Sequence, residues 1–397
     1  MQRYSFTPRP ASEAGFAPAV LAELAAYADV RTAMGDLPGT VMLLARGDDL
    51  VFFDTAGYAD VALRTPLHSD AIFTLYSMTK PLTAAGILLL YDEGRWQLDD
   101  PVERYLLEFA DIALLPGSGA TRGPTMRELF THTAGFSFGR TPEEVMETVR
   151  RIGWSNARSL TELIGRYAEM PLAYQPGQDW QYSVATDLQA EIVERLTGER
   201  FDLFMQRRLF DPLGMADTRF QLDHEQARRL VTGHIRVPET GKLRAATDAE
   251  RLESTFPMGG TSFKSTAMDY ARFARMLLNR GTLGDTRVLS SDAVELMLTN
   301  QLSEKFLQTP RGVQHYQLGN GNGHALNGLV CVDPARAGRP VGRGTYEWGG
   351  AFGTWFWVDP EHDILFVGMT HVQREQGNPR PIDVISQELV YRALRSS

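Results

Sequence analysis

Hydrophobic positions recur at helical spacing near the start of the chain. Leu21, Leu24 and Val30 fall on one side of a helix drawn over residues 17–33. Side chains three and four positions apart share a helix face. We therefore expect an amphipathic helix over residues 17–33 that packs on a sheet. A second helix over residues 382–394 is expected to close the chain.

Short β-rich runs follow this first helix. Residues 41–45 and 50–56 are two such runs, and Arg46-Gly47-Asp48-Asp49 lies between them. Two β-rich runs on either side of a short polar turn predict a hairpin. Residues 72–75 are also β-rich, and we expect them to pair beside the hairpin.

The middle of the chain, from Leu98 to about residue 255, has a mainly helical pattern. Residues 186–197 are the best example, because Leu188 and Ile192 lie on one stripe there. Gly198 then ends the predicted helix.

The last part of the chain returns to strands. Gly259-Gly260 opens this part, and Thr266 begins a helix with a sequence typical of a capping box. Residues 355–358 and 364–369 are expected to form two strands joined by a polar turn.

The order of helix, strands, helical block, strands and helix predicts an α+β fold. Early and late strands most simply form one antiparallel sheet with both terminal helices on one face, an α/β sandwich to which the helical block adds a second lobe. We expect residues 1–97 and 256–397 to form a discontinuous α/β domain and residues 98–255 a mainly helical domain. The active site is expected in the cleft between them.

A serine and a lysine three residues apart stand between the run at 71–75 and the next helix. In Ser77-Met78-Thr79-Lys80, this spacing brings a hydroxyl and an amine within hydrogen-bond reach on a helix. Pro81 has no N–H and is tolerated only in a first helical turn, so the helix begins close to Ser77. We expect it to run to about Glu93. Ser77 then lies at the positive end of the helix dipole, where an oxyanion is favoured.

Composition indicates a folded protein that acts on small molecules. The chain has 397 residues, 43% hydrophobic and 10% aromatic, which is enough for a substantial core in about two domains. Its formal net charge of −9 argues against nucleic acid as the partner, because phosphate binding needs clustered Lys and Arg. The expected partner is a small, neutral or apolar molecule.

No sequence feature indicates a metal, a cofactor, export or a membrane. The single cysteine, Cys331, excludes an internal disulfide and a thiolate metal cluster. The histidines lack ligand spacing such as His-x-x-x-His, so we expect no metal and no cofactor. Residues 1–10 lack the pattern of a signal peptide, and no run of about 18 apolar residues follows. We expect a cytoplasmic protein that makes no membrane contact.

Three motifs in a fixed order carry a resemblance to a known superfamily. Ser77 to Lys80, Tyr182-Ser183-Val184 and Trp348-Gly349-Gly350 resemble the three motifs of the serine β-lactamases and penicillin-binding proteins. Supporting segments are similar too: Leu129 to Gly135, Asp211 to Met215, and Gly259 to Ser262. The resemblance extends from about residue 17 to the C-terminus and implies a fold like that of the class C β-lactamases.

Within this superfamily the chain most resembles the family VIII carboxylesterases, which are built on the class C β-lactamase fold. Where lactamases carry Lys-Thr-Gly, this chain has Trp348-Gly349-Gly350, so the cation that pairs with a β-lactam carboxylate is missing. Where class C lactamases carry Tyr-x-Asn, the third position is Val184, which removes an amide. Both exchanges make the pocket more apolar.

The resemblance implies catalytic roles for the matching residues. Ser77 would attack an ester carbonyl while a neighbouring base takes its proton. Lys80 can be that base if burial lowers its pKa, and Tyr182 is the other candidate, since its phenol can relay the proton to the leaving alkoxide. Both candidates stand. The backbone N–H groups of Ser77 and Ala351 would hold the oxyanion.

Substrate contacts follow from the same resemblance. Gly349 and Gly350 would let the strand approach the substrate closely. Trp348 would wall the acyl or alcohol pocket, and Val184 would contribute to its apolar lining.

A second serine carries a competing signature. Residues 135–139 match the Gly-x-Ser-x-Gly elbow of the α/β-hydrolases, with Ser137 at its centre. That elbow must lie between a strand and a helix, whereas this copy follows a helical stretch. We therefore expect Ser137 not to be the nucleophile, and His132 to be a structural hydrogen-bonding residue rather than a triad base.

The function predicted from these residues is hydrolysis of small, short-chain neutral esters through an acyl-serine intermediate. Acyl transfer to an alcohol is an alternative, since acyltransferases share this fold. β-Lactamase or D-alanyl peptidase activity is disfavoured by Trp348 and Val184. An inactive binding member of the superfamily would be expected to lose Ser77, Lys80 or Tyr182, and all three are present.

Overall fold

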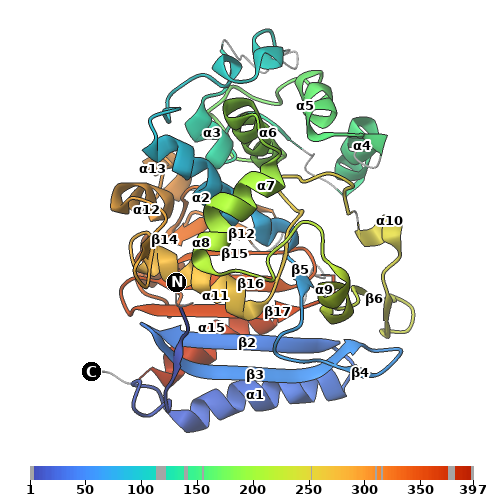
Figure 1. The fold of residues 1–397 in the computed structure, drawn as a ribbon, viewed down its shortest axis with the longest axis vertical. Coiled ribbons are helices and arrows are strands. Elements are labelled where there is room, and N and C mark those ends of the chain that lie inside the picture. The colour runs from blue at the N-terminus through green and yellow to red at the C-terminus, as the bar shows by residue number, and fades with distance from the viewer. Residues whose placement is uncertain are drawn as a thin grey trace.

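The computed structural model of the protein describes residues 4–112, 122–137, 142–153, 156–251, 253–308, 311–313, 316–373 and 381–394. One sheet runs through its lower half (Figure 1), with the strand order β1-β3-β2-β17-β16-β15-β14-β13, and β4 pairs with β3. Strand β1 is parallel to β3, and the other pairs are antiparallel. The strands of this sheet are β1 (Thr7–Pro8), β2 (Gly39–Arg46), β3 (Asp49–Asp60), β4 (Thr65–Pro66), β13 (Asn322–His324), β14 (Leu329–Cys331), β15 (Tyr346–Gly349), β16 (Thr354–Asp359) and β17 (Ile364–Thr370).

The early and late strands join in the middle of this sheet. β2 and β3 form the predicted hairpin, with Val41 opposite Thr55. β17 pairs with the other edge of β2, with Phe366 opposite Leu44. The prediction that both ends of the chain build one sheet is therefore confirmed, and so is the α+β class.

The terminal helices cover one face of the sheet, which we call the outer face. They are α1 (Pro18–Ala33) and α15 (Ile382–Ala393), which pack on each other. Figure 1 shows α1 along the underside of β3. Side chains alternate along a strand, so Met42 and Leu44 face these helices while Val41 and Leu43 belong to a separate, larger core. Both helices were predicted on this face, which is confirmed.

The larger core lies on the opposite, inner face. Helix α11 (Ala267–Leu278) packs there on β2, β16 and β17. Its N-cap is Thr266, whose hydroxyl accepts the Asp269 N–H at 3.1 Å, as its sequence predicts. The site helix α2 (Thr79–Asp92) belongs to the same core, and its residues Thr79 to Leu90 are all buried.

Helices dominate the chain between β5 and β8, in the upper part of Figure 1. Helix α6 ends as predicted, because Gly198 follows it at φ 71°. The exact limits of the two predicted domains stay a prediction. The elements between Leu98 and residue 255 are η2 (Val102–Arg104), η3 (Leu107–Phe109), α3 (Met126–Phe130), α4 (Pro142–Ile152), α5 (Leu160–Ala168), α6 (Ala185–Thr197), α7 (Phe201–Met205), η5 (Gln206–Phe210), α8 (Asp211–Leu213), α9 (His224–Arg229), β6 (His234–Arg236), β7 (Leu243–Ala245) and α10 (Asp248–Arg251).

Short elements complete the structure between α2 and the last strands. They include η1 (Tyr76–Met78), β5 (Phe73–Thr74), β8 (Lys264–Ser265), β9 (Thr282–Leu283), β10 (Thr286–Arg287), α12 (Ser291–Leu298), α13 (Glu304–Gln308), β11 (Arg311–Val313), β12 (Tyr316–Leu318) and α14 (Pro334–Ala337).

The expectation that residues 72–75 pair beside the hairpin is wrong. β5 pairs instead with β8, Phe73 lying opposite Ser265, and the Leu75 N–H donates to the Phe263 carbonyl at 2.9 Å. The free edge of β3 is already taken by β1 and β4. The run at 72–75 therefore serves to carry the chain to the site.

Candidate active site

Ser77 lies in η1, immediately before α2. The residue before it, Tyr76, has a left-handed φ of 47°, which is costly for a bulky side chain. Its ring stacks on Phe352 with 4.7 Å between centroids, and this packing holds the turn. Pro81 lies in the first turn of α2, as predicted. The turn thus presents Ser77 at the helix N-terminus.

The structure brings the three predicted catalytic side chains together. Ser77 Oγ and Tyr182 Oη form a 2.7 Å hydrogen bond in which either hydroxyl can donate. The Lys80 amine donates to Ser77 Oγ at 3.4 Å and lies 4.9 Å from the centre of the Tyr182 ring. Tyr182 comes from the segment just before α6, more than a hundred positions along the chain. The hydroxyl of Ser77 therefore lies within hydrogen-bond distance of both candidate bases.

Burial changes the proton affinity of both partners. Lys80 is 4% exposed, and burial lowers the pKa of its amine to about 8, although the charge of Asp187 acts in the opposite direction. Burial also raises the pKa of the Tyr182 phenol above its ordinary value, while the hydrogen bond from Ser77 lowers it. Near neutral pH the lysine is close to its titration point and the tyrosine keeps its proton. Lys80 is thus better placed to accept a proton directly, and Tyr182 to pass one on.

The lysine is held by residues that the three motifs do not include. Its amine donates to the Gly260 carbonyl at 2.9 Å, and the Gly260 N–H donates to the Asp187 carboxylate at 2.9 Å. The sequence places Gly259-Gly260 only in a supporting segment and leaves Asp187 without a role. A signal was present, because Asp187 is an acid beside the buried stripe of its helix, five positions after Tyr182.

The end of β15 packs against η1, the turn that carries Ser77. In the described residues, the N–H groups of Ser77 and Ala351 donate to no backbone carbonyl of a turn or loop. A Cβ at Gly350 would lie 2.3 Å from the Leu75 carbonyl oxygen, so only glycine fits. The Thr354 hydroxyl donates to that same carbonyl at 3.2 Å. This arrangement suits the two N–H groups that were predicted to bind an oxyanion.

Aromatic rings surround Tyr182. Trp348 is 2% exposed, and its ring lies 5.9 Å from that of Tyr182. The His132 ring lies 4.9 Å from Tyr182, and its Nδ1 is 3.3 Å from Ser183 Oγ. Burial holds the pKa of His132 well below its usual range, so its ring is neutral. Val184 precedes the first residue of α6 and is buried at 6% exposure. Whether Trp348, Gly349, Gly350 and Val184 touch substrate stays a prediction.

The segment before Ser137 lacks the local structure of an α/β-hydrolase elbow. Ser137 follows α3 and a loop, and none of the described residues between α3 and Ser137 is in a strand. Phe138 and Gly139 of the predicted elbow lie outside the described residues. The strand that such an elbow requires is therefore missing before Ser137.

Comparison with known proteins agrees with this arrangement. Residues 24–387 match the model of the Beta-lactamase family. The chain belongs to the beta-lactamase family. Protein Rv1367c of Mycobacterium tuberculosis is 33% identical over 84% of this chain and 85% of its own length. Esterase EstB of Burkholderia gladioli is 29% identical over 89% of this chain and 91% of its own.

A solved structure extends the likeness to three dimensions. EstCE1, described as a hydrolase with promiscuous acyltransferase activity, superposes with a TM-score of 0.80 at 23% identity and covers 94% of this chain and 99% of its own. At that identity this likeness shows the β-lactamase fold, and the family match with the similarity to Esterase EstB supports a serine hydrolase.

Two further findings concern ligands and membranes. Within the described residues, no group of His, Cys, Asp and Glu is arranged to hold a metal ion. None of the described helices is both long and apolar enough to cross a bilayer.

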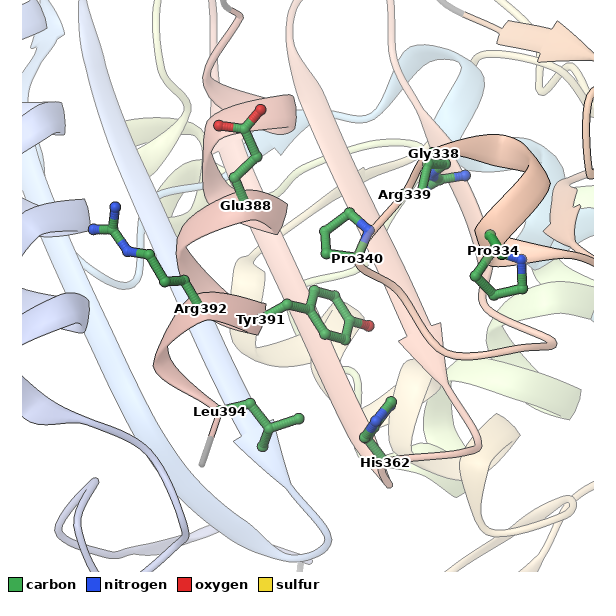
Figure 2. Close-up of a pocket in the computed structure, with 10 residues that line it drawn as sticks. Pro334, Gly338, Arg339, Pro340, His362, Glu388, Tyr391, Arg392 and Leu394 are labelled. Atoms are coloured by element: carbon green, nitrogen blue, oxygen red, sulfur yellow. The ribbon is translucent and has the colours of Figure 1, made fainter. Parts of the chain in front are cut away.

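A separate pocket of about 640 Å³ lies beside α15, away from the motifs (Figure 2). Its polar groups already bond to the protein. The Tyr391 hydroxyl donates to Asp359 at 2.6 Å, and Arg339 bonds to the side chains of Glu347 and Gln387. These groups of the pocket are therefore already engaged and are poorly placed to bond a ligand.

Proposed function

We propose that this chain is a carboxylesterase of the family VIII type that hydrolyses small, short-chain neutral esters through an acyl-serine intermediate. The observation that carries the proposal is the contact of Ser77 with Tyr182 at 2.7 Å and with Lys80 at 3.4 Å. Its likeness to Esterase EstB over 89% of the chain supports the esterase assignment. An inactive binding protein would have no reason to hold these three groups together.

The proposed reaction has two halves. Ser77 Oγ attacks the ester carbonyl as its proton moves to Lys80 or through Tyr182, and the oxyanion is stabilised by the N–H groups of Ser77 and Ala351. The C–O bond to the alcohol then breaks, and the leaving alkoxide takes the proton. Water next attacks the acyl-serine, gives up a proton to the same base, and the carboxylic acid leaves as Ser77 regains its proton.

Substrate class follows from what the third motif lacks. A charge-assisted hydrogen bond in a dehydrated site contributes roughly 1.5 to 3 kcal/mol, so replacing a cation by Trp348 removes about one to two decades of affinity for a β-lactam carboxylate. The carboxylate would also be left partly unpaired against an indole ring. A neutral ester carries no such cost and gains apolar contact with that ring.

Acyl transfer to an alcohol is the second candidate function. EstCE1, a hydrolase that shares this fold, is described as having promiscuous acyltransferase activity. The same acyl-serine serves both outcomes, because an alcohol can attack it in place of water.

The deciding experiment compares substrates. We expect kcat/KM for a short-chain aryl ester to exceed that for benzylpenicillin by at least about a thousandfold. An acetoxy-bearing cephalosporin should lose acetate and keep its lactam ring, which mass spectrometry of the products reveals. Adding methanol to the aryl ester assay would yield methyl ester if acyl transfer competes. Efficient ring opening of both antibiotics would refute the esterase assignment and favour a lactamase.

A further inference from the structure

One buried carboxylate near the nucleophile has no role in the chemistry described above. Asp187 lies in the first turn of α6 and is 3% exposed. A carboxylate this deeply buried is destabilising unless its oxygens are bonded and its charge is matched. Its contacts therefore indicate what it does.

The oxygens of Asp187 accept from donors on two segments. Oδ1 accepts the Gly260 N–H at 2.9 Å, and Oδ2 accepts the Tyr167 hydroxyl of α5 at 3.1 Å. The neighbouring Gly259 N–H also lowers the pKa of the carboxylate. Burial raises the pKa of Asp187, and the charge of Lys80 and these hydrogen bonds oppose that rise, because donors favour the ionised, acceptor-only carboxylate.

Asp187 and Lys80 form hydrogen bonds with the two backbone groups of the same residue, Gly260. Asp187 holds the N–H of Gly260, and Lys80 holds its carbonyl at 2.9 Å. A Cβ built on Gly260 would lie 3.2 Å from Asp187 Oδ1 and 3.1 Å from Lys80 Nζ. The two charges thus face each other across a glycine that has no side chain to separate them.

The loop that carries Gly260 has little freedom to move. The Gly259 carbonyl accepts the Thr83 hydroxyl of α2 at 2.7 Å. A Cβ on Gly259 would lie 2.2 Å from the Thr186 carbonyl oxygen of α6. The loop is therefore wedged between α2 and α6, and the separation of Asp187 and Lys80 is fixed.

We propose that Asp187 is a positioning residue for the reaction, which fixes the Gly260 loop under Lys80 and supplies the negative charge that faces the lysine amine. The inference rests on the proposed acyl-serine chemistry only in that Lys80 takes part in activating Ser77. Asp187 itself touches neither substrate nor the Ser77 hydroxyl.

The charges around the pair agree with this role. Burial lowers the pKa of Lys80 to about 8 and the charge of Asp187 raises it, while burial raises the pKa of Asp187 and the charge of Lys80 lowers it. The other titratable groups that face the pair are Tyr167, Tyr182 and His132. Tyr182 keeps its proton and the His132 ring is neutral, so Asp187 and Lys80 are the two charges of this group.

The test is the variant Asp187→Asn, which removes the charge and keeps an oxygen that can accept the Gly260 N–H. The readout is the pH dependence of two rates: kcat/KM for an aryl ester, and labelling of Ser77 by an alkyl fluorophosphonate. Burial lowers the pKa of Lys80 to about 8, so we expect both profiles of the wild type to change with pH near that value, a step that we call the Lys80 limb. We expect this limb to move about one pH unit lower in Asp187→Asn, the effect of removing a nearby opposite charge.

Two further variants separate charge from structure. Asp187→Glu keeps the charge, and its limb should stay at the wild-type pH. Glu191→Gln removes another buried carboxylate of α6, one that pairs with Arg195 at 2.8 Å. It should lower the melting temperature and leave the limb in place.

The outcomes are distinct. An unmoved limb in folded Asp187→Asn would overturn the proposal, and so would an equal movement in Glu191→Gln. Should Asp187→Asn fail to fold, a limb displaced by a full pH unit in Asp187→Glu would count against it. A wild type that is labelled by the fluorophosphonate but does not hydrolyse esters would refute the proposed function alone, since the labelling profiles would still report on Asp187.

Discussion

The two sides of the protein are packed with different chemistry. On the outer face, α1 and α15 cover the sheet with a cluster of hydrophobic side chains that includes Leu24, Trp357 and Phe366. On the site side, α2 and α6 bury Lys80 and Asp187 along with hydroxyl and amide groups. Both regions bury charge, since Asp359 beside α15 is also fully buried, but only the second buries it beside the nucleophile.

The comparison indicates that the outer face contributes to the free energy of unfolding, whereas the buried charge on the site side lowers it. Lowering the pKa of Lys80 from 10.5 to about 8 corresponds to a cost of about 3 kcal/mol at neutral pH. Burying one leucine side chain contributes about 1.5 to 3 kcal/mol, so the outer face can offset this cost with one or two residues. Variants on the site side should lose activity while folded, and variants on the outer face should lose stability while active.

The largest expected effect tests the site side. Ser77→Ala should lower ester hydrolysis by at least about 10⁴-fold, because no other group can form the acyl intermediate. The melting temperature should change little. Ser137→Ala is the matched control and should keep near-wild-type activity in the same assay. If Ser137→Ala were the inactive variant, the nucleophile would have been misidentified.

The next effect tests the outer face. Leu24 is fully buried between α1 and the sheet, and Leu24→Ala should lower the free energy of unfolding by about 2 to 5 kcal/mol. Urea titration measures this loss, while kcat of the folded enzyme should stay the same. Val30→Ala on the same helix is the control. The prediction that Val30 shares the packed side with Leu21 is wrong, because nine positions are about two and a half helical turns. Val30 is 54% exposed, so its loss should cost under about 0.5 kcal/mol. A large drop in kcat for Leu24→Ala would show that the two sides are coupled.

A smaller effect on rate tests whether both candidate bases take part in moving the Ser77 proton. Lys80→Ala and Tyr182→Phe should each reduce kcat by at least about a hundredfold, because both serve the path of the Ser77 proton. Circular dichroism and thermal unfolding should confirm that each variant folds. Full activity in Tyr182→Phe would remove Tyr182 from the mechanism and leave Lys80 as the only base.

The smallest expected effect is a loss of stability at acid pH. Burial lowers the pKa of His324, near Trp348, to about 4, although its hydrogen bond to the Ala325 carbonyl acts in the opposite direction. An unfolded histidine titrates near 6.5. Between these values the unfolded state binds more protons, so stability is complete above about pH 6.5 and falls as the pH drops towards 4.

The pH dependence can be assigned to this residue by substitution. We expect His324 to account for a loss of about 2 kcal/mol in the free energy of unfolding between pH 7 and pH 5. His324→Gln should reduce the slope by this amount, measured by urea titration at each pH, and the slope that remains is expected from other buried histidines such as His132 and His371. His68→Gln, at an exposed position, should keep the wild-type slope. Equal slopes in wild type and His324→Gln would contradict the assignment.

Much of the fold could be predicted because its signals are local. The helix over 17–33, the hairpin of β2 and β3 and the closing helix all follow from spacing and turn residues, and the structure has them within one to four residues at each end. The start of α2 was also local, since Pro81 permits only a first turn. The three motifs then placed Ser77, Lys80 and Tyr182, and the structure brings their side chains together.

What the sequence missed depends on contacts between distant segments. Residues 72–75 have strand character, but their partner was decided by which edge was free, and β8 lies about 190 positions away. Asp187 escaped notice for a related reason. An acid in a first helical turn usually indicates only a favourable interaction with the helix dipole. The bond of Asp187 to Gly260 depends on a loop more than seventy positions away, which the local sequence does not show.

The contact between Gly350 and Leu75 bears on how this enzyme can change over evolution. Any side chain at position 350 would strike the carbonyl that leads into the nucleophile turn, 2.3 Å away. Two positions earlier, Trp348 contacts its neighbours through a side chain, which another residue can replace at some cost in packing. The end of β15 and the turn after it thus combine a position that only glycine fits, Gly350, with a position that other residues can occupy, Trp348. Under the proposed function, in which Trp348 walls the substrate pocket, new substrate preferences would arise at Trp348 by single substitutions while the geometry beside Ser77 stays unchanged.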